Sequence, residues 1–110
     1  MSLKKKDRIE QLENFMKEQP QDPFFVYALA LEYVDDDDAK AESYFIQTYQ
    51  NFPSYLPLYY HAAMFYDKLG QVDKARVFFL KGIELAKSTD AGFALKELEN
   101  AYQNFEFLHS

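Results

Sequence analysis

One pattern of apolar residues occurs twice in the sequence, at a separation of 33 residues that becomes 34 in the second half of each copy. Self-similarity at a fixed period of this length is typical of repeat proteins. Within each copy the pattern has spacings of three and four, which predicts helices rather than strands. Since one pair of helices cannot bury both its faces alone, successive copies are expected to stack. The matched positions are Val26 with Tyr59, Leu29 with Ala62, Ala30 with Ala63, Tyr33 with Tyr66, Ala41 with Ala75 and Phe45 with Phe79.

Helical spacing extends through the rest of the chain, and no segment keeps the alternation of apolar and polar residues that a strand would show. We therefore expect an all-α fold, an α-solenoid of antiparallel helix pairs with about six helices including those that cap its ends. The expected organisation is a single domain over residues 1–110. Its parts are an N-terminal half-repeat helix at 7–18, a first repeat at 23–55, a second repeat at 56–88 and a C-terminal capping helix at 90–108.

Residues that favour helix starts mark several of these boundaries. Asp7, with Glu10 three residues later, has the arrangement of a capping box for the first helix. Asp22 before Pro23 predicts an N-cap followed by a proline at the first helical position, where a missing N–H costs nothing. The triplet at 88–90, Ser-Thr-Asp, is rich in N-cap residues and predicts the start of the last helix.

Four consecutive aspartates, Asp35–Asp38, lie between the two expected helices of the first repeat. They indicate either a cation site or a helix connection. A calcium loop starting at the first of them would need a glycine at its sixth place and a glutamate at its twelfth, but these places hold Lys40 and Ile46. The EF-hand interpretation therefore fails, although weak cation binding stays open. We interpret the run as a turn without glycine, in which Asp37 or Asp38 caps the following helix.

The residues of the two copies also match the pattern of a known family. They are Val26, Leu29, Ala30, Tyr33, Ala41, Phe45 and Pro53 in the first copy and Tyr59, Ala62, Ala63, Tyr66, Gly70, Ala75, Phe79 and Gly82 in the second. This arrangement resembles the tetratricopeptide repeat (TPR) family, and the chain looks like a small TPR protein of the bacterial type. The first copy departs from the family pattern because it lacks the turn glycine. The resemblance covers nearly the whole chain.

The resemblance implies a non-catalytic scaffold for protein–protein interactions, in which the first helices of successive repeats line a concave groove that receives a peptide or a helix. The groove positions here are mainly aromatic and apolar, so we expect an apolar or amphipathic ligand. Two alternatives stay open: the first or last helix covers these side chains, or a second copy does, as in a self-assembling homodimer through the groove or the end helices. The expected groove residues are Phe24, Tyr27, Leu31, Val34, Pro57, Tyr60, His61, Met64 and Lys68.

Some TPR domains hold the acidic C-terminal tails of chaperones with a set of lysines, arginines and asparagines in the groove. The comparable positions here hold Tyr27, Ala28, Tyr60 and His61. Lys68 alone would supply a cation. A carboxylate clamp is therefore not expected.

The composition argues against several other classes of function. Eighteen acidic and twelve basic residues give a net charge of -6, which repels a phosphate backbone, so no nucleic-acid partner is expected. The longest apolar run, residues 24–31, is far shorter than the roughly twenty residues that span a bilayer, so no membrane partner is expected. The basic start of the chain is followed by charged rather than apolar residues, which is unlike a signal peptide. We therefore expect a cytoplasmic protein.

Nothing in the sequence indicates an enzyme or a metalloprotein. Without cysteine, neither a disulfide nor a thiolate metal site can form. His61 and His109 are the only histidines, and no metalloprotease, phosphate-loop or serine-hydrolase motif occurs. No catalytic, cofactor-binding or metal-binding residue is expected, and no cofactor.

Overall fold

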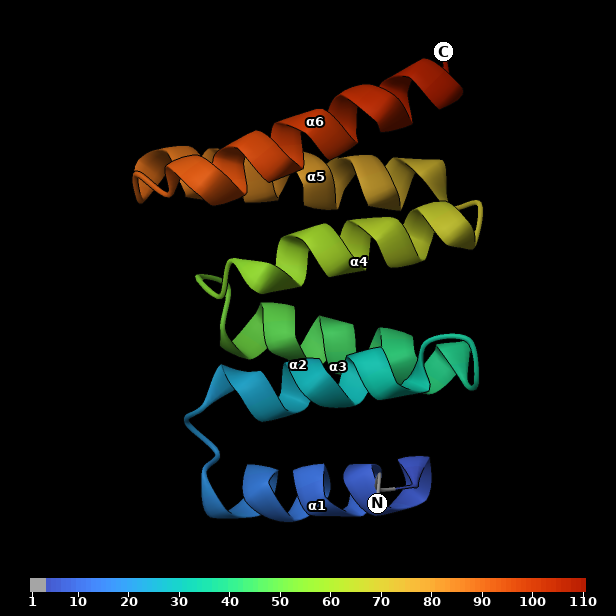
Figure 1. Cartoon of the computed structure of the whole chain (residues 1–110), viewed down its shortest axis with the longest axis vertical. Coiled ribbons are helices and arrows are strands. Elements are labelled where there is room, and N and C mark those ends of the chain that lie inside the picture. The colour runs from blue at the N-terminus through green and yellow to red at the C-terminus, as the bar shows by residue number, and fades with distance from the viewer. Residues whose placement is uncertain (1–3) are drawn as a thin grey trace. The chain divides into compact units, whose positions relative to one another are not determined.

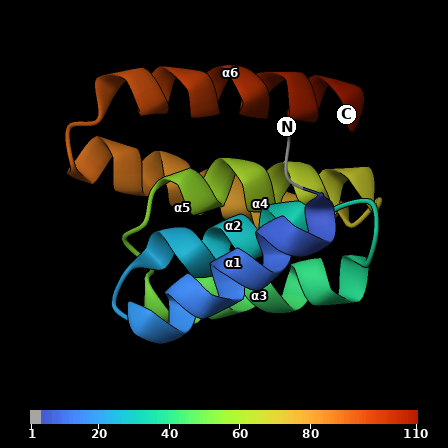
Figure 2. The ribbon, with the colours of Figure 1, turned by 60° about the horizontal axis from the view of Figure 1, so that its bottom comes forward.

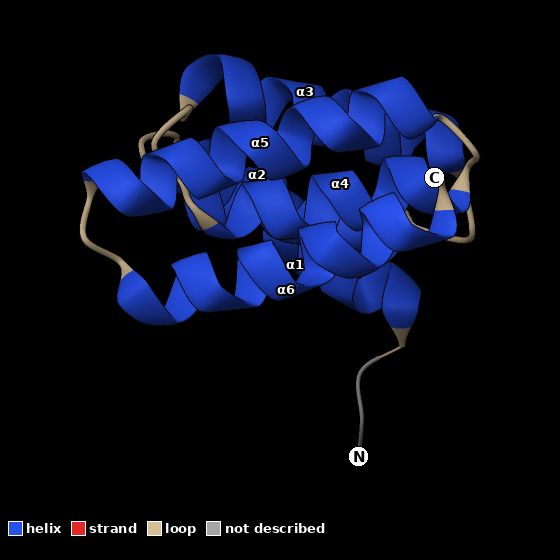
Figure 3. Cartoon of the chain, turned by 90° about the horizontal axis from the view of Figure 1, so that it is seen from above, coloured by secondary structure: helices blue, strands red, loops and turns tan. Residues whose placement is uncertain are grey.

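The computed structural model describes residues 4–110, and within this range the chain forms six helices and no strands (Figures 1 and 3). The expected all-α architecture is thereby confirmed. The chain divides into two compact units, one ending at Tyr55 and the other running from Leu56 to Ser110, each with its own core. The expectation of a single domain stays a prediction. The helices are α1 (Lys5–Glu18), α2 (Pro23–Tyr33), α3 (Asp38–Asn51), α4 (Pro57–Lys68), α5 (Val72–Ser88) and α6 (Gly92–Leu108).

In the first unit, α2 and α3 form an antiparallel pair, and α1 packs against α2 (Figure 2). Small residues let the paired helices approach, while Phe45, which is fully buried, fills the space between them. The hydroxyl group of the buried Thr48 donates to the carbonyl oxygen of Tyr44 at 2.7 Å, so its polar atom is satisfied. The buried residues of the pair are Val26, Leu29, Ala30, Ala41, Phe45 and Thr48.

α1 is held to α2 by an aromatic stack and by ion pairs. The rings of Phe15 and Phe25 stack with centroids 5.4 Å apart. The Arg8 guanidinium donates to both carboxylate oxygens of Glu32, at 2.9 Å from Nε and 3.2 Å from Nη2. Fork geometry of this kind fixes orientation as well as adding charge attraction. The N-terminal helix is therefore part of the first unit rather than a loose appendage.

In the second unit, α5 packs against both α4 and α6 (Figure 1). Phe79 of α5 is fully buried, and its ring lies 5.1 Å from that of Phe105 on α6. On the other side of α5, the Phe78 ring stacks on Tyr66 of α4 at 5.6 Å. Burying an aromatic side chain of this size stabilises a fold by about 1.5 to 3 kcal/mol. α5 is thus the central helix of this unit.

Two of the predicted helix caps are wrong, and both errors have a local cause, although the last helix does begin after the triplet 88–90. α1 begins at Lys5 because the Lys4 carbonyl accepts hydrogen bonds from the backbone N–H groups of Asp7 and Arg8, each at 3.0 Å. Asp7 therefore lies inside the first turn, where its charge complements the helix dipole, and it is not an N-cap. The hydroxyl groups of Ser88 and Thr89 donate to the Leu85 carbonyl, so they satisfy the end of α5 instead of starting α6.

The connection formed by the aspartates is a tight turn, as predicted. Val34 (φ -57°, ψ 132°) and Asp35 (φ 74°) have the angles of a type II turn, and the Asp36 N–H closes it on the Tyr33 carbonyl at 3.0 Å. The Asp37 carboxylate then accepts from the Lys40 N–H at 3.1 Å, which confirms its predicted role as N-cap of α3. A type II turn favours glycine at its third residue, and here Asp35 takes that place.

The equivalent connection of the second unit has a different design. Gly70 (φ 77°) donates its N–H to the Asp67 carbonyl at 3.0 Å, and the next N–H, of Gln71, donates to the Tyr66 carbonyl at 2.9 Å. This pair of bonds is a Schellman motif, in which glycine supplies the left-handed conformation. None of the helices in the described part of the chain is long and apolar enough to cross a membrane.

Candidate functional site

One hollow of the second unit lies between α4 and α6. It has a volume of about 370 Å³. One wall comes from the exposed face of α4 and the other from α6, while Phe105 closes the floor. Its lining residues are Tyr60, Met64 and Asp67 of α4 and Glu97, Asn100, Ala101, Asn104, Phe105 and Leu108 of α6.

A second hollow of about 180 Å³ adjoins the first and shares Tyr60 and Glu97 with it. It lies toward the start of both helices. Because the two hollows have lining residues in common, they are two stretches of one depression, which we call the α4–α6 groove. The residues that line the smaller stretch are Leu56, Pro57, Tyr60, His61, Ala94, Glu97 and Leu98.

The groove has an apolar wall on α4. Pro57, Tyr60 and Met64 recur at spacings of three and four, so they lie on one face of this helix. Met64 keeps 41% of its surface exposed, and Tyr60 is half-buried. The His61 ring stands edge-on to the Tyr60 ring with centroids 5.3 Å apart. The rigid core behind α4, where Tyr59, Ala62 and Ala63 are buried, fixes this face in place.

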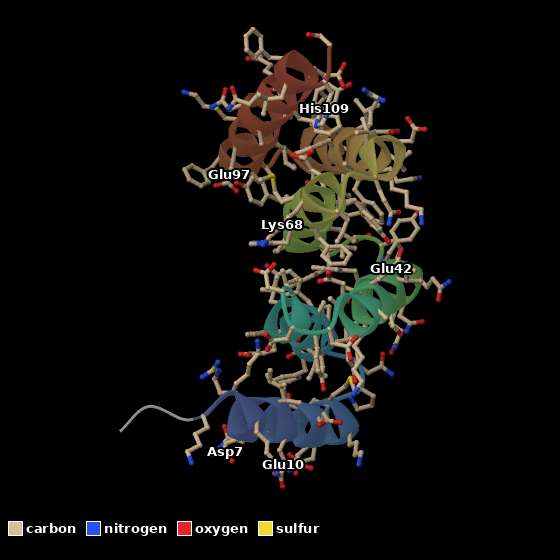
Figure 4. The ribbon with its side chains drawn as sticks, turned by 90° about the vertical axis from the view of Figure 1, so that its right-hand side faces the viewer. Asp7, Glu10, Glu42, Lys68, Glu97 and His109 are labelled. Atoms are coloured by element: carbon tan, nitrogen blue, oxygen red, sulfur yellow. The ribbon has the colours of Figure 1, made fainter. Side chains whose placement is uncertain are left out.

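The wall on α6 combines apolar residues with a row of polar ones. Glu97, Asn100 and Asn104 recur at spacings of three and four along one face and are all exposed. Within residues 4–110, the side-chain amides of the two asparagines make no hydrogen bond to the protein, so they are available to a ligand. Figure 4 shows Glu97 and Lys68 extending to the same side of the second unit.

Acidic side chains determine the charge of the groove. At one end, the His109 ring nitrogen Nε2 lies 2.7 Å from a carboxylate oxygen of Asp67, which links the end of α6 to α4. Nearer the start of the helices, partial desolvation lowers the pKa of His61, while the charge of Glu97 acts in the opposite direction. The groove lining contains no lysine or arginine among the described residues.

The expected groove residues of the second unit mostly come together in this depression. Pro57, Tyr60, His61 and Met64 all line it. Lys68 is the last residue of α4 and is exposed, but it lines neither stretch.

The expected groove residues of the first unit lie on or beside α2. Phe24 is 43% exposed and stacks on Phe25 at 5.6 Å, and Leu31 is also exposed. The Tyr27 ring meets Tyr55 edge-on at 5.2 Å, and burial together with the neighbouring Tyr55 raises the pKa of Tyr27 to about 12. Val34 is half-buried in the turn after the helix.

Sequence reasoning missed the α6 wall because it assigned this helix only a capping role. A signal was present in the sequence. Leu95, Leu98 and Tyr102 have the same spacings of three and four as Tyr59, Ala62 and Tyr66, which mark the first helix of the second repeat. By this match, α6 corresponds to the first helix of a further repeat, and its groove positions include Glu97 and Asn100.

Among the described residues, the carboxylates of the aspartate run are not grouped as a metal site requires. Asp37 caps α3, and the Asp36 carboxylate forms an ion pair with Lys5. Across residues 4–110, no three histidine, cysteine, aspartate or glutamate side chains are grouped so that they could hold a metal ion.

Antiparallel helix pairs with a groove between equivalent helices define a helical-repeat protein, and comparison with solved structures identifies which kind. The solution NMR structure of a tetratricopeptide repeat domain protein from Salinibacter ruber superposes with a TM-score of 0.74 at 34% sequence identity, covering 81% of this chain and 91% of that one. A crystal structure of a tetratricopeptide repeat domain protein from the same organism gives 0.71 at 34% identity, covering 79% and 98%. Searches against family models and curated proteins found no match.

The chain belongs to the tetratricopeptide repeat family. These two structural matches and the all-α fold confirm the resemblance that the repeat positions indicated. Membership supports a general function as a repeat scaffold for protein–protein interactions, since TPR domains are generally non-catalytic and typically mediate such interactions.

Proposed function

We propose that this chain is a non-catalytic scaffold that binds an apolar or amphipathic peptide or helix of a partner protein in the α4–α6 groove. The observation that carries the proposal is the groove itself, a hollow of about 370 Å³ in which Tyr60 and Met64 of α4 lie opposite a row of polar side chains on α6. Clefts with apolar linings and a few polar groups are the usual form of binding sites.

The apolar part of the groove supports binding by burial. Met64 and Leu108 are 41% and 72% exposed at its edges, with Tyr60 between the two stretches. Each square ångström of apolar surface that a ligand covers contributes roughly 25 cal/mol before the costs of association. Tyrosine is also enriched among the residues that dominate interface energies.

Self-assembly is the alternative function, and one observation favours it. Phe93 and Phe107 of α6 are 85% and 81% exposed. Their separation of 14 residues brings them to nearly the same side of the helix. Pairing of two copies through α6 would cover both rings. In either case we expect a cytoplasmic protein without nucleic-acid or membrane partners.

Affinity capture from the source cell tests the proposal when wild type is compared with Tyr60→Ala and with Tyr27→Ala. We expect Tyr60→Ala to lose the captured partner while its circular dichroism stays that of wild type. Tyr27→Ala reports whether the aromatic face of the first unit also takes part. Retention of every partner by a folded Tyr60→Ala protein would remove the α4–α6 groove as the binding site.

Sedimentation of the wild-type chain separates the two functions. A monomer at high concentration supports hetero-partner binding, whereas a dimer that dissociates on Phe93→Ser or Phe107→Ser substitution supports self-assembly. Both phenylalanines are exposed, so these substitutions leave the core intact.

A further inference from the structure

We propose that the α4–α6 groove selects an extended segment of a partner protein in which a lysine or arginine lies next to an apolar residue. The inference rests on the proposed function and names the chemistry of its ligand. The basic side chain would meet Glu97, and the apolar side chain would cover Tyr60 and Met64.

Charge complementarity is the first argument. Asp67 and Glu97 are the two ionised groups that line the larger stretch, and the lining there and in the smaller stretch includes no lysine or arginine. The lining of the smaller stretch includes His61, whose pKa is lowered by partial desolvation, whereas Lys68 lies outside both linings. With a net charge of -6 on the chain, the groove attracts a cationic segment and repels an acidic one.

Glu97 is the carboxylate best placed to bind the cation. Asp67 already lies 2.7 Å from the His109 ring. Glu97 is exposed, lines both stretches and forms no ion pair within the described chain. It lines both stretches together with Tyr60, so a basic side chain that reached it would have neighbours within reach of the apolar face of α4.

The two asparagines indicate an extended ligand. Side-chain amides offer both donors and an acceptor, which suits the alternating N–H and C=O groups of a peptide backbone. Asn100 and Asn104 follow Glu97 along the same face of α6. Glu97 and Leu108 are eleven positions apart, which corresponds to a rise of about 16 Å along the helix and matches about five residues of extended chain.

The chain's own basic segment is a poor occupant of this groove. The cluster Lys4–Arg8 is the only dense group of basic residues in the sequence. Within it, Lys5 is paired with Asp36 and Arg8 with Glu32, both in the first unit. Docking of this segment into a second copy would break both ion pairs, so we assign the groove to a segment of another protein.

Selection from a displayed library of random linear peptides on the full chain tests the proposal. We expect enrichment of peptides with a lysine or arginine next to apolar residues. The selected peptides are then measured against wild type, Glu97→Lys and Glu84→Lys. Glu84 is exposed on α5 and lines neither stretch, so Glu84→Lys makes the same change in net charge away from the groove.

We expect Glu97→Lys to weaken binding by about 2- to 25-fold, because an exposed ion pair is lost and a like-charge contact replaces it, while Glu84→Lys has a much smaller effect. Equal weakening by both variants would show only a long-range effect of net charge and would overturn the assignment to Glu97. A dimer of the free chain that Glu97→Lys dissociates would also overturn it, since a second copy would then fill the groove.

The same experiment distinguishes failure of this inference from failure of the proposed function. If the selected peptides lack basic residues but still need Tyr60 for binding, the proposed basic ligand is contradicted. The groove then remains the binding site. Selected peptides that bind equally well to folded Tyr60→Ala and Glu97→Lys proteins, or a library that yields no binder, would contradict both.

Discussion

Gly82 of α5 faces Tyr59 of α4 so closely that a Cβ atom on the glycine would stand 2.6 Å from the Tyr59 Cβ. The same Cβ would lie 3.3 Å from both methyl groups of Leu98 on α6. The absence of a side chain at this one position therefore lets α5 approach α4 while α6 covers the junction. Because α4 and α6 form the walls of the groove, this contact also determines the groove's shape.

We expect Gly82→Ala to destabilise the protein by about 1 to 3 kcal/mol, because the new methyl group overlaps the Cβ atom of Tyr59. A change of side-chain rotamer does not move a Cβ atom, so the α4 backbone itself would have to shift. The quantity to be measured is the free energy of unfolding in urea. Gly92→Ala is the matched control, since a Cβ there has nothing within 4 Å. Equal stability of Gly82→Ala and wild type would mean that α4 and α5 are not packed as described.

Asp90 adopts a left-handed backbone conformation (φ 55°) at the end of α5, where the Ala91 N–H donates to the Ala86 carbonyl at 2.9 Å. Glycine reaches this conformation without strain, so we expect Asp90→Gly to raise the thermal midpoint, with a gain of up to about 1 kcal/mol. The reverse change, Gly70→Ala at φ 77°, is expected to cost about 1 to 2 kcal/mol. A loss of stability on Asp90→Gly would contradict the assigned helix end.

The Arg8–Glu32 pair links α1 to α2, and a double-mutant cycle with Arg8→Gln and Glu32→Gln measures its coupling. We expect about 0.2 to 1 kcal/mol, since the Arg8 side chain is 44% exposed and surface pairs are weak. The cycle is required because Arg8 has other interactions besides this one. The coupling should fall as salt is added. A coupling of zero at low salt would show that the pair does not hold α1 in place.

Tyr27 titrates at unusually high pH, and this makes stability depend on pH in a predictable direction. Its pKa is raised from 10.0 to about 12 in the folded chain, first by desolvation and then by Tyr55. The folded state therefore holds this proton more tightly, so the contribution to stability is complete below pH 10 and is lost as pH rises toward 12. We expect Tyr27→Phe to lose less stability than wild type over that range. Parallel losses would contradict the desolvated position of Tyr27.

The helix boundaries that could be predicted from sequence were those set by a local side-chain contact. Asp22 and Asp37 both accept the backbone hydrogen bond expected of an N-cap. The starts of α1 and α6 could not be predicted in this way, because Lys4 and Ala91 precede them and neither makes a side-chain cap. There the boundary follows from packing and backbone bonds, which local preference does not encode.

The α4 side of the candidate site could be predicted from sequence, but the α6 side could not. Tyr60 and Met64 were predicted because apolar side chains that are not needed for the core pattern indicate an interaction surface. Glu97 and Asn104 on the facing wall are polar residues of an exposed helix face, which from sequence alone is the ordinary appearance of solvent-facing surface. Only the packing of α6 against α5, beside α4, gives those polar residues an apolar wall to face.

The central claim is that a partner segment binds between α4 and α6, and amide NMR spectra of the full chain test it most directly. A peptide selected on the wild-type protein is titrated in, and residue-by-residue shifts are followed. We predict that the largest shifts lie at Tyr60, Met64, Glu97, Asn100 and Asn104. Shifts confined to the exposed faces of α3 and α5, with these five residues unchanged, would contradict the claim.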